Sequence, residues 1–264
     1  MRRVAIVTGA GRGIGAATVG ALAADGWSVL AVDRGADDPR LPYALASAAD
    51  LDAVVAAANE AAGEERARAA IADATDAIAM AAAVAAAEEW GGVEAVVANA
   101  GVIAGGVPAW ELSVEQEDAV VEACLRGVMV AARVGIPALL RRPEPRAGRF
   151  VATASAATFR GLPGLAAYCA AKAGVSGFVR ALGADLRGTG ITAAAVAPGS
   201  TDTPILAESA RLYDIEGARS FASQQPIDRL IEPAEIAAMI AWLCGPGGAA
   251  VTGTTLSVDG GLTI

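Results

Sequence analysis

The sequence predicts an α/β fold in which a doubly wound parallel sheet of seven strands lies between two layers of helices. Short apolar runs rich in β-branched residues alternate with longer helical segments along all 264 residues, which is typical of βαβ units. The runs are also apolar without polar alternation, as expected of strands that are buried on both faces. We therefore expect a single domain over residues 1–264.

The expected elements follow one another in strict alternation. We expect strands at residues 4–7, 28–32, 67–72, 93–98, 149–154, 192–197 and 255–258, and helices at about 13–25, 50–62, 76–90, 114–141, 165–187 and 233–244. The first apolar run meets Gly9 too soon to be a signal peptide. The alanine-rich stretch between Asp76 and Glu88 is too short to cross a bilayer, which takes about 20 apolar residues.

Two long connections leave from the carboxyl ends of expected strands, where this architecture binds ligands. The first is an insertion at about 34–49, although such a connection usually needs about 2–6 residues. Ser47 and Asp50 would cap the helix that follows it. The second is a flap at about 199–232, which either forms a hydrophobic wall of a substrate site or packs as an ordinary helical flap. Its apolar side chains are Leu206, Leu212, Tyr213, Ile215 and Phe221.

Composition excludes several classes of chemistry. The chain has 0 His, which excludes Ser-His-Asp and Cys-His nucleophile schemes and most zinc and non-haem iron sites, so no metal site is expected. A net charge of −9 without any lysine-rich run argues against binding to nucleic acid or an anionic membrane. Cys124, Cys169 and Cys244 stand far apart without a CxxC pair, so we expect no disulfides and a cytoplasmic location.

A glycine-rich turn follows the first expected strand and opens the first helix. It reads Thr8-Gly9-Ala10-Gly11-Arg12-Gly13-Ile14-Gly15, a T-G-x-x-x-G-x-G pattern that differs from the common G-x-G-x-x-G. Such glycines let the backbone approach a pyrophosphate, and the helix N-terminus favours the anion. The candidate cofactor-binding residues here are Gly9, Arg12, Gly13, Ile14 and Gly15. The alternative is a glycine turn without a ligand.

Acidic residues after the second and third strands indicate how a dinucleotide would be held. Asp33 ends the second strand near the distance expected of a carboxylate that binds the ribose hydroxyls of adenosine. Such a carboxylate would repel a 2′-phosphate, which favours NAD over NADP. Arg12 and Arg34 weigh against this preference because either could contact that phosphate. Asp73 is a candidate acceptor for the adenine amino group, or simply a turn residue.

The single lysine of the chain points to a tyrosine-based proton transfer. Lys172 follows Tyr168 by four residues, so the two side chains share a helix face. A cation within about 4–6 Å can lower a phenol pKa from about 10 by about 1–3 units, which makes tyrosine a usable acid/base near neutrality. Ser155, at the end of the fifth strand, could hold the substrate oxygen. These three residues are the candidate catalytic group.

Together the motifs resemble those of the short-chain dehydrogenase/reductase family over essentially the whole chain. The resemblance is carried by the glycine turn, Ser155 with Tyr168-x-x-x-Lys172, Asn99-Ala100-Gly101, Pro198-Gly199-x-x-x-Thr203 and Asp259-Gly260-Gly261. It implies a Rossmann-like domain in which Tyr168 is the acid/base and Ser155 stabilises the reacting oxygen. Lys172 would bind the nicotinamide ribose and lower the tyrosine pKa.

The same resemblance assigns further roles. Asn99, Ala100 and Gly101 would support the cofactor site, and the segment with Pro198, Gly199, Thr201 and Thr203 would contact the nicotinamide carboxamide and the pyrophosphate. It also implies a homotetramer or homodimer formed through the long helices at about 114–141 and 165–187.

One residue departs from the family pattern. Cys124 stands where the family usually has an asparagine, which is thought to hold a water in the proton relay behind the lysine. A thiol is a weak hydrogen-bonding group that often behaves as a small hydrophobe. The relay is therefore either rerouted or slow, and we expect that Cys124→Asn raises the catalytic rate.

The insertion after Asp33 suggests a narrower resemblance. Its pattern of D-R-x-x-x-D-P followed by L-P-Y-x-L-A looks like the subgroup associated with the peptide-derived redox cofactor mycofactocin. That resemblance implies a tightly held NAD that an external carrier re-oxidises in place. The alternative is a surface insertion with ordinary, exchangeable NAD.

Three functions are consistent with these residues. The first is an NAD-dependent oxidoreductase that interconverts a hydrophobic secondary alcohol and its ketone. The second is an NADPH-dependent 3-oxoacyl-thioester reductase, against which Asp33 and the lack of a basic patch for an acidic carrier protein argue. The third is a non-catalytic nucleotide-sensing protein, which only Cys124 favours.

Overall fold

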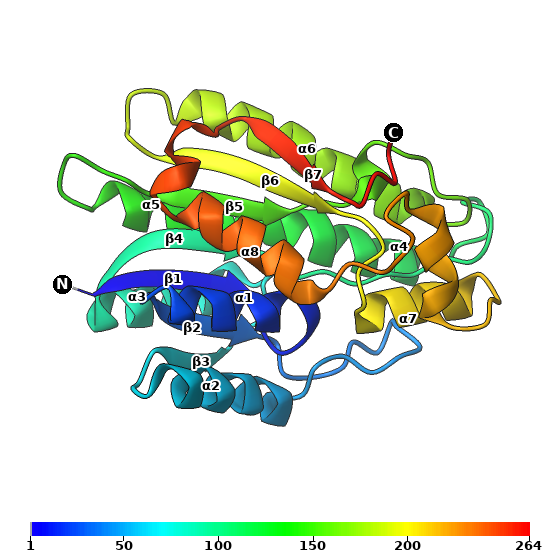
Figure 1. Ribbon diagram of the computed structural model, residues 1–264, viewed down its shortest axis with the longest axis horizontal. Coiled ribbons are helices and arrows are strands. Elements are labelled where there is room, and N and C mark those ends of the chain that lie inside the picture. The colour runs from blue at the N-terminus through cyan, green and yellow to red at the C-terminus, as the bar shows by residue number, and fades with distance from the viewer. Residues whose placement is uncertain (1) are drawn as a thin grey trace.

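The computed structural model describes residues 2–264 and contains one parallel sheet in the order β3-β2-β1-β4-β5-β6-β7 (Figure 1). The strands are β1 (Arg3–Thr8), β2 (Ser28–Asp33), β3 (Ala67–Ile71), β4 (Gly92–Ala98), β5 (Arg149–Thr153), β6 (Thr192–Pro198) and β7 (Thr254–Val258). All neighbouring strands pair in parallel. The predicted fold class is confirmed.

Helices cover both faces of this sheet (Figure 1). The α-helices are α1 (Gly13–Ala24), α2 (Ala48–Ala62), α3 (Ala77–Trp90), α4 (Val114–Val121), α5 (Gly127–Leu140), α6 (Ala166–Asp185), α7 (Pro204–Leu212) and α8 (Pro233–Cys244). Shorter helical turns are η1 (Glu122–Arg126), η2 (Ala156–Thr158), η3 (Ala218–Gln224) and η4 (Pro246–Ala250). Each helical layer buries one side of the sheet.

The core explains why the strands are apolar at every position. Alternate side chains of a strand point to opposite faces. In β1, Val4 and Ile6 pack into the hydrophobic cluster that contains Met80 of α3, while Ala5 and Val7 pack into the cluster that contains Leu22 of α1. Both faces of β1 are therefore buried, as the sequence predicts.

The strand order places the candidate site. Consecutive strands run outward from β1 toward β3, and the chain then crosses to β4 on the other side of β1. Ligands bind in open α/β sheets where the strand order reverses, beyond the carboxyl ends of the strands. The ends of β1 and β4 therefore mark the expected cleft.

The structure divides the predicted helix at 114–141 into three parts. α4 and α5 are joined by η1, one turn of π-helix that contains the buried Cys124. π-turns inside α-helices insert an extra residue and often occur at functional sites. Periodicity over the whole segment did not reveal this interruption.

The two irregular connections also acquire local structure. Ser47 caps α2, and its side chain and that of Asp50 form a capping box, which confirms the predicted helix start. The flap is more ordered than its sequence pattern indicated, since it contains α7 and η3. Thr203 caps α7 through a hydrogen bond from the Leu206 backbone N–H at 3.3 Å, and Pro204 stands at the first turn, where its missing N–H costs nothing.

Three further features of residues 2–264 concern metal ligands, cysteines and apolar helices. No group of three or more His, Cys, Asp or Glu side chains that could hold a metal ion is found in this range. Cys124, Cys169 and Cys244 are free thiols. The helical run Val114–Leu140 is long and apolar enough to cross a membrane by length and composition alone, but half of its most apolar window is buried against the rest of the fold. We interpret it as a core helix.

Candidate active site

A single cavity of about 610 Å³ lies at the carboxyl ends of the strands and collects almost all the predicted site residues. Those that line it are Gly9, Arg12, Gly13, Ile14, Asp33, Arg34, Asp73, Asn99, Ala100, Gly101, Ser155, Tyr168, Lys172, Pro198, Gly199, Thr201 and Thr203. Gly15 does not line the cavity. A Cβ on Gly15 would lie 2.0 Å from the Gly9 carbonyl oxygen, so this glycine allows α1 to pack against the turn instead of facing a ligand.

The glycine turn packs closely against the end of β4 and leaves the N-terminus of α1 without a side-chain cap. Gly9 has φ of +66°, and a Cβ there would lie 2.7 Å from the Ala100 Cα. Arg12 occupies the N-cap of α1 without any side-chain capping bond, so the N–H groups of the first turn are not satisfied by a cap. This combination fits the pyrophosphate of a dinucleotide.

Asn99 fastens the glycine turn to the central strands. Its side-chain nitrogen donates to the carbonyl oxygens of Thr8 and Gly9 at 3.1 and 3.2 Å. Its Oδ1 accepts from the Thr153 hydroxyl at 3.1 Å, and the Thr153 carbonyl accepts from Lys172 Nζ at 2.8 Å. A continuous hydrogen-bond chain therefore joins the lysine to the glycine turn. No sequence motif indicated Thr153.

The acidic end of the cavity is ordered by backbone and arginine contacts. Asp33 Oδ2 accepts from the Gly11 backbone N–H at 2.9 Å. Arg34 pairs with Asp38 at 2.9 Å and with Asp73 at 3.4 Å, while Arg12 donates to the Ala44 carbonyl at 2.8 Å. Both arginines that could have taken a 2′-phosphate therefore have partners within the chain.

Asp73 forms the predicted turn and lies on the cavity wall. Its Oδ1 accepts from the backbone N–H and the hydroxyl of Thr75, both at 2.8 Å, which is the turn that the alternative interpretation predicts. It also lines the cavity beside Arg34.

The candidate catalytic residues meet at the buried end of the cavity. Tyr168 and Lys172 stand one turn apart on α6, and Lys172 is only 3% exposed. Lys172 Nζ lies 5.7 Å from the centroid of the Tyr168 ring. Ser155 follows β5, and its hydroxyl lies close enough to the Tyr168 phenol to lower the pKa of that phenol.

The expected lowering of the Tyr168 pKa is wrong for this arrangement. Burial raises the pKa of the Tyr168 phenol well above its usual value, and the Ser155 hydroxyl lowers it only in part. Burial also lowers the pKa of Lys172. The ammonium points toward the Thr153 carbonyl, so the cost of removing the phenolate from water outweighs its attraction.

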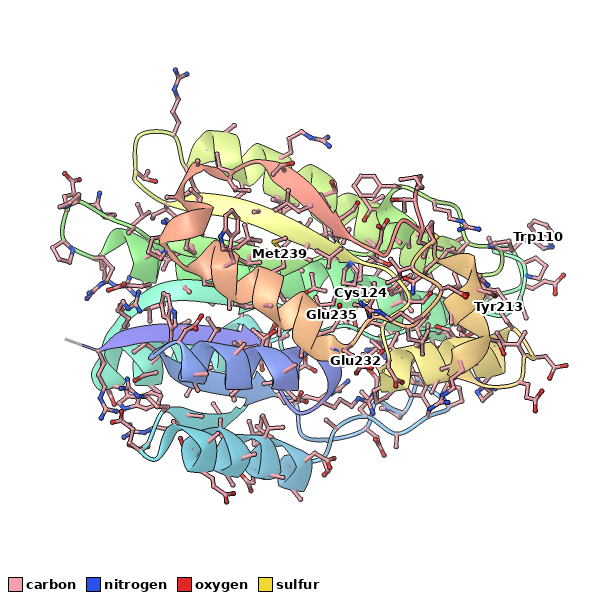
Figure 2. All side chains as sticks on the ribbon, in the orientation of Figure 1. Trp110, Cys124, Tyr213, Glu232, Glu235 and Met239 are labelled. Atoms are coloured by element: carbon pink, nitrogen blue, oxygen red, sulfur yellow. The ribbon has the colours of Figure 1, made fainter. Side chains whose placement is uncertain are left out.

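Cys124 lies directly behind this group, in the interior of the fold (Figure 2). Its Sγ donates to the Val102 carbonyl at 3.1 Å and accepts from the Val102 backbone N–H at 3.4 Å. A Cβ on Gly101 would lie 3.3 Å from this sulfur and 3.5 Å from Lys172 Nζ. The thiol and the ammonium thus flank the same glycine, at the position where the family places its relay asparagine.

Residues 34–47, which we call the strap, connect β2 to α2 and extend beyond the carboxyl ends of the strands, on the side where α7 lies (Figure 1). The Tyr43 hydroxyl accepts from the Ile103 backbone N–H at 2.9 Å. Arg40 pairs with the buried Asp38 at 2.8 Å and with Glu122 at 2.7 Å. Burial raises the pKa of Tyr43 to about 12. The strap is therefore anchored to the loop after β4 and to η1, two contacts that no sequence pattern indicated.

The flap forms the outer wall. Tyr213 stands in the flap (Figure 2). Its hydroxyl donates to the Pro163 carbonyl at 2.8 Å, and its ring packs edge-on against that of Phe221. Four of the five predicted apolar side chains, Leu206, Tyr213, Ile215 and Phe221, line the cavity. Leu212 does not, and its backbone lies against Gly106 instead.

Comparisons with known proteins agree with this geometry. A family model described as enoyl-(acyl carrier protein) reductase matches residues 9–263. The cis-4-hydroxycyclohexanecarboxylate dehydrogenase of Sinomonas cyclohexanicum is 38% identical over 265 residues, which cover 99% of this chain and 96% of that protein.

Two solved structures show the same arrangement. The carveol dehydrogenase of Mycobacterium avium in complex with NAD gives a TM-score of 0.91 at 28% identity, covering 98% of this chain and 97% of that chain. The structure of an actinorhodin polyketide ketoreductase with NADPH gives a TM-score of 0.86 at 36% identity, and the match covers 99% of this chain and 97% of that chain. The chain belongs to the short-chain dehydrogenase/reductase family of oxidoreductases.

Proposed function

We propose that this protein uses NAD to interconvert a hydrophobic secondary alcohol and its ketone. The observation that carries the proposal is one cavity with Ser155, Tyr168 and Lys172 at its buried end and Asp33 beside the glycine turn. When bound there, NAD accepts a hydride from the alcohol carbon or returns it to the ketone.

Each side chain has a separate task in this proposal. In the oxidation, Tyr168 takes the hydroxyl proton of the alcohol as the hydride leaves the carbon, so that alcohol and NAD⁺ give ketone, NADH and one proton. Ser155 donates a hydrogen bond to the reacting oxygen. Lys172, held by the Thr153 carbonyl, keeps a positive charge beside the phenol and the ribose.

NAD is preferred over NADP for an electrostatic reason. Asp33 presents a carboxylate to the end of the cavity where adenosine would lie, and it would repel a 2′-phosphate. Arg12 and Arg34 are already bonded to Ala44, Asp38 and Asp73. The carveol dehydrogenase relative holds NAD, which supports this preference, whereas the ketoreductase relative holds NADPH.

The apolar flap supports a hydrophobic substrate. Leu206, Ile215 and Phe221 line the part of the cavity that also contains Tyr168. The Sinomonas relative is named for a hydroxylated cyclohexane carboxylate, so cyclic secondary alcohols are the first substrates to test.

The decisive experiment follows reduced nicotinamide by absorbance with cyclic and aliphatic secondary alcohols. Tyr168→Phe should lower the rate by about 10²- to 10⁴-fold, the usual contribution of a positioned acid/base. NADH binding, measured by fluorescence, should stay within about threefold of the parent because the phenol hydroxyl is one contact among many. Equal rates for parent and variant on every alcohol would favour the nucleotide-sensing alternative.

The strap supports a slower exchange of NAD than in an open site. It is anchored at Tyr43 and Arg40 and lies across the end of the cavity from which the dinucleotide would leave. We therefore propose a tightly held NAD, re-oxidised in place by an external carrier such as mycofactocin.

Purification without added nucleotide tests this proposal. Bound NAD(H) should remain with the protein, and alcohol oxidation should run faster with an artificial electron acceptor than with free NAD. An empty protein that turns over readily with free NAD would contradict it.

A second candidate is an NADPH-dependent 3-oxoacyl-thioester reductase, favoured by the ketoreductase similarity. It predicts NADPH-dependent reduction of acetoacetyl thioesters at rates above those with NADH.

A further inference from the structure

One cation at the outer end of the cavity has no place in the chemistry described above. Arg160 follows Ser155 in the loop before α6 and lines the cavity at a solvent-exposed position. Its Nη1 donates to the Leu262 carbonyl at 3.3 Å. Its guanidinium also acts on the Tyr213 hydroxyl, because burial raises the pKa of Tyr213 and the charge of Arg160 opposes that rise. Arg160 and Tyr213 both line the cavity.

No carboxylate within residues 2–264 neutralises the charge of Arg160. None of the ion pairs found within residues 2–264 involves it. The acidic residues that line the cavity are Asp33, Asp38 and Asp73, and all three belong to the strap end, around Arg34 and Gly11. An anion entering past the flap would therefore meet a guanidinium without a competing carboxylate from the cavity wall.

The wall of the same cavity carries apolar side chains. Leu162, Leu165, Leu206 and Phe221 line the cavity together with Tyr168 and Arg160. A substrate whose carbinol carbon lies against Tyr168 can extend along these apolar side chains and present its opposite end to Arg160.

We propose that Arg160 is a specificity-determining residue that binds an anionic group at the end of the substrate remote from the reacting carbon. This inference rests on the proposed alcohol–ketone chemistry and adds the substrate class: an apolar alcohol or ketone that carries an oxyanion. A carboxylate of a hydroxy acid and a phosphate of a carrier thioester share that chemistry, since each accepts charge-assisted hydrogen bonds from a guanidinium.

Substrate pairs in which one member carries the anion and the other lacks it test the proposal. The first pair is cis-4-hydroxycyclohexanecarboxylate and its methyl ester, followed in the oxidation direction. The second pair is acetoacetyl-4′-phosphopantetheine and acetoacetyl-pantetheine, which differ by the phosphate group, followed in the reduction direction. For each pair the measured quantity is the ratio of kcat/KM for the charged member to kcat/KM for the neutral member, in the parent and in Arg160→Gln.

The parent should prefer the charged member of one pair, and Arg160→Gln should lower that ratio by about 10- to 30-fold, the usual size of a charge-assisted hydrogen bond. The pair that shows the loss identifies the source of the anion as carboxylate or phosphate. Arg160→Lys should restore part of the ratio, because it keeps the charge and loses the planar fork. Most of the loss should appear in KM.

Two controls distinguish anion binding by Arg160 from a merely structural role. Arg187→Gln removes an exposed arginine in the turn after α6, away from the cavity, and should leave both ratios unchanged. The Kd of unreactive cyclohexanecarboxylate, measured by calorimetry with the parent and Arg160→Gln, reports binding without turnover.

The outcomes separate the inference from the function on which it rests. Turnover of both members of each pair with ratios that Arg160→Gln does not change overturns the role of Arg160 and leaves the alcohol–ketone chemistry standing. No turnover of any alcohol or ketone by the parent overturns the proposed function, and the inference with it.

Discussion

At the scale of single residues, Cys124 carries the clearest departure from its family. The sulfur occupies a fully buried position and makes two hydrogen bonds with the backbone of Val102. The thiol therefore pairs both the N–H and the carbonyl of Val102, although thiol hydrogen bonds are weak, and it lies near Lys172. Cys124 thus has a structural role in addition to replacing the relay asparagine of the family.

We predict that Cys124→Asn raises the catalytic rate by restoring a strong hydrogen-bonding group behind Lys172. Cys124→Ser should keep both Val102 contacts, whereas Cys124→Ala should lower the free energy of unfolding by about 1–3 kcal/mol because it leaves buried backbone groups unpaired. Steady-state rates across pH and denaturant unfolding measure the two effects. A rate for Cys124→Asn that is unchanged or lower at every pH counts against the relay interpretation.

The pKa of Tyr168 leads to a second residue-scale prediction. Because burial raises this pKa, the phenol is protonated at neutral pH, and alcohol oxidation needs the phenolate. We expect kcat/KM for oxidation to rise by about tenfold per pH unit below the pKa, while ketone reduction, which needs the protonated phenol, stays level through neutrality. Initial rates in both directions from pH 6 to 10 test this. A plateau of oxidation near pH 7 would show that another charge lowers the phenol pKa.

At the scale of elements, the strap is the feature that distinguishes this cavity. Asp38 is only 4% exposed and receives hydrogen bonds from Arg34 and Arg40, which hold the pKa of its carboxyl well below the usual range. Arg40 then reaches Glu122 of η1. The ionic cluster and Tyr43 connect β2 to the π-turn that holds Cys124.

We predict that Tyr43→Phe accelerates the release of NAD. Removal of the hydroxyl leaves the Ile103 N–H without its acceptor, which costs about 1–3 kcal/mol and loosens the strap. Stopped-flow displacement of NADH measures the release rate. Tyr213→Phe is the matched control, since it removes one hydroxyl from the flap and none from the strap. Equal release rates for the parent and Tyr43→Phe would show that the strap does not retain the dinucleotide.

At the scale of the whole molecule, exposed apolar side chains gather on the long helical run 114–140. Val114, Val121, Met129 and Leu140 are between 36% and 69% exposed. Neighbouring apolar side chains on a helix surface are typical of an interface between subunits. The family resemblance predicts association through the same helices.

We therefore expect a homotetramer or homodimer in solution, and Met129→Arg should weaken it because a charge would be buried at the interface. Light scattering over a range of micromolar concentrations measures the molecular mass. Arg133→Gln, on the same helix, is a control that adds no charge. A monomer at every concentration would contradict the prediction.

The sequence allowed the fold to be predicted closely because its signals are local. Apolar runs, glycine turns and the capping residues Ser47 and Asp50 act within a few positions of one another. Motif spacing likewise indicated Tyr168, Lys172, Ser155 and the glycine turn, since helical periodicity and strand order bring them to one edge of the sheet. The interruption at η1 escaped because the apolar pattern continues through it, and Cys124 within it contacts Val102, which lies 22 residues away along the chain.

The sequence by itself determined the parallel sheet, the position of its cleft and the residue types available for chemistry, because a chain without histidine has few ways to move a proton. Only the tertiary structure decided how the charges are partnered. Arg12 and Arg34 are bonded within the chain, Arg160 has no carboxylate partner among residues 2–264, and Tyr168 is buried enough for its pKa to rise. Electrostatic effects depend on distance and burial in three dimensions. The spacing of residues along the chain gives neither of these quantities.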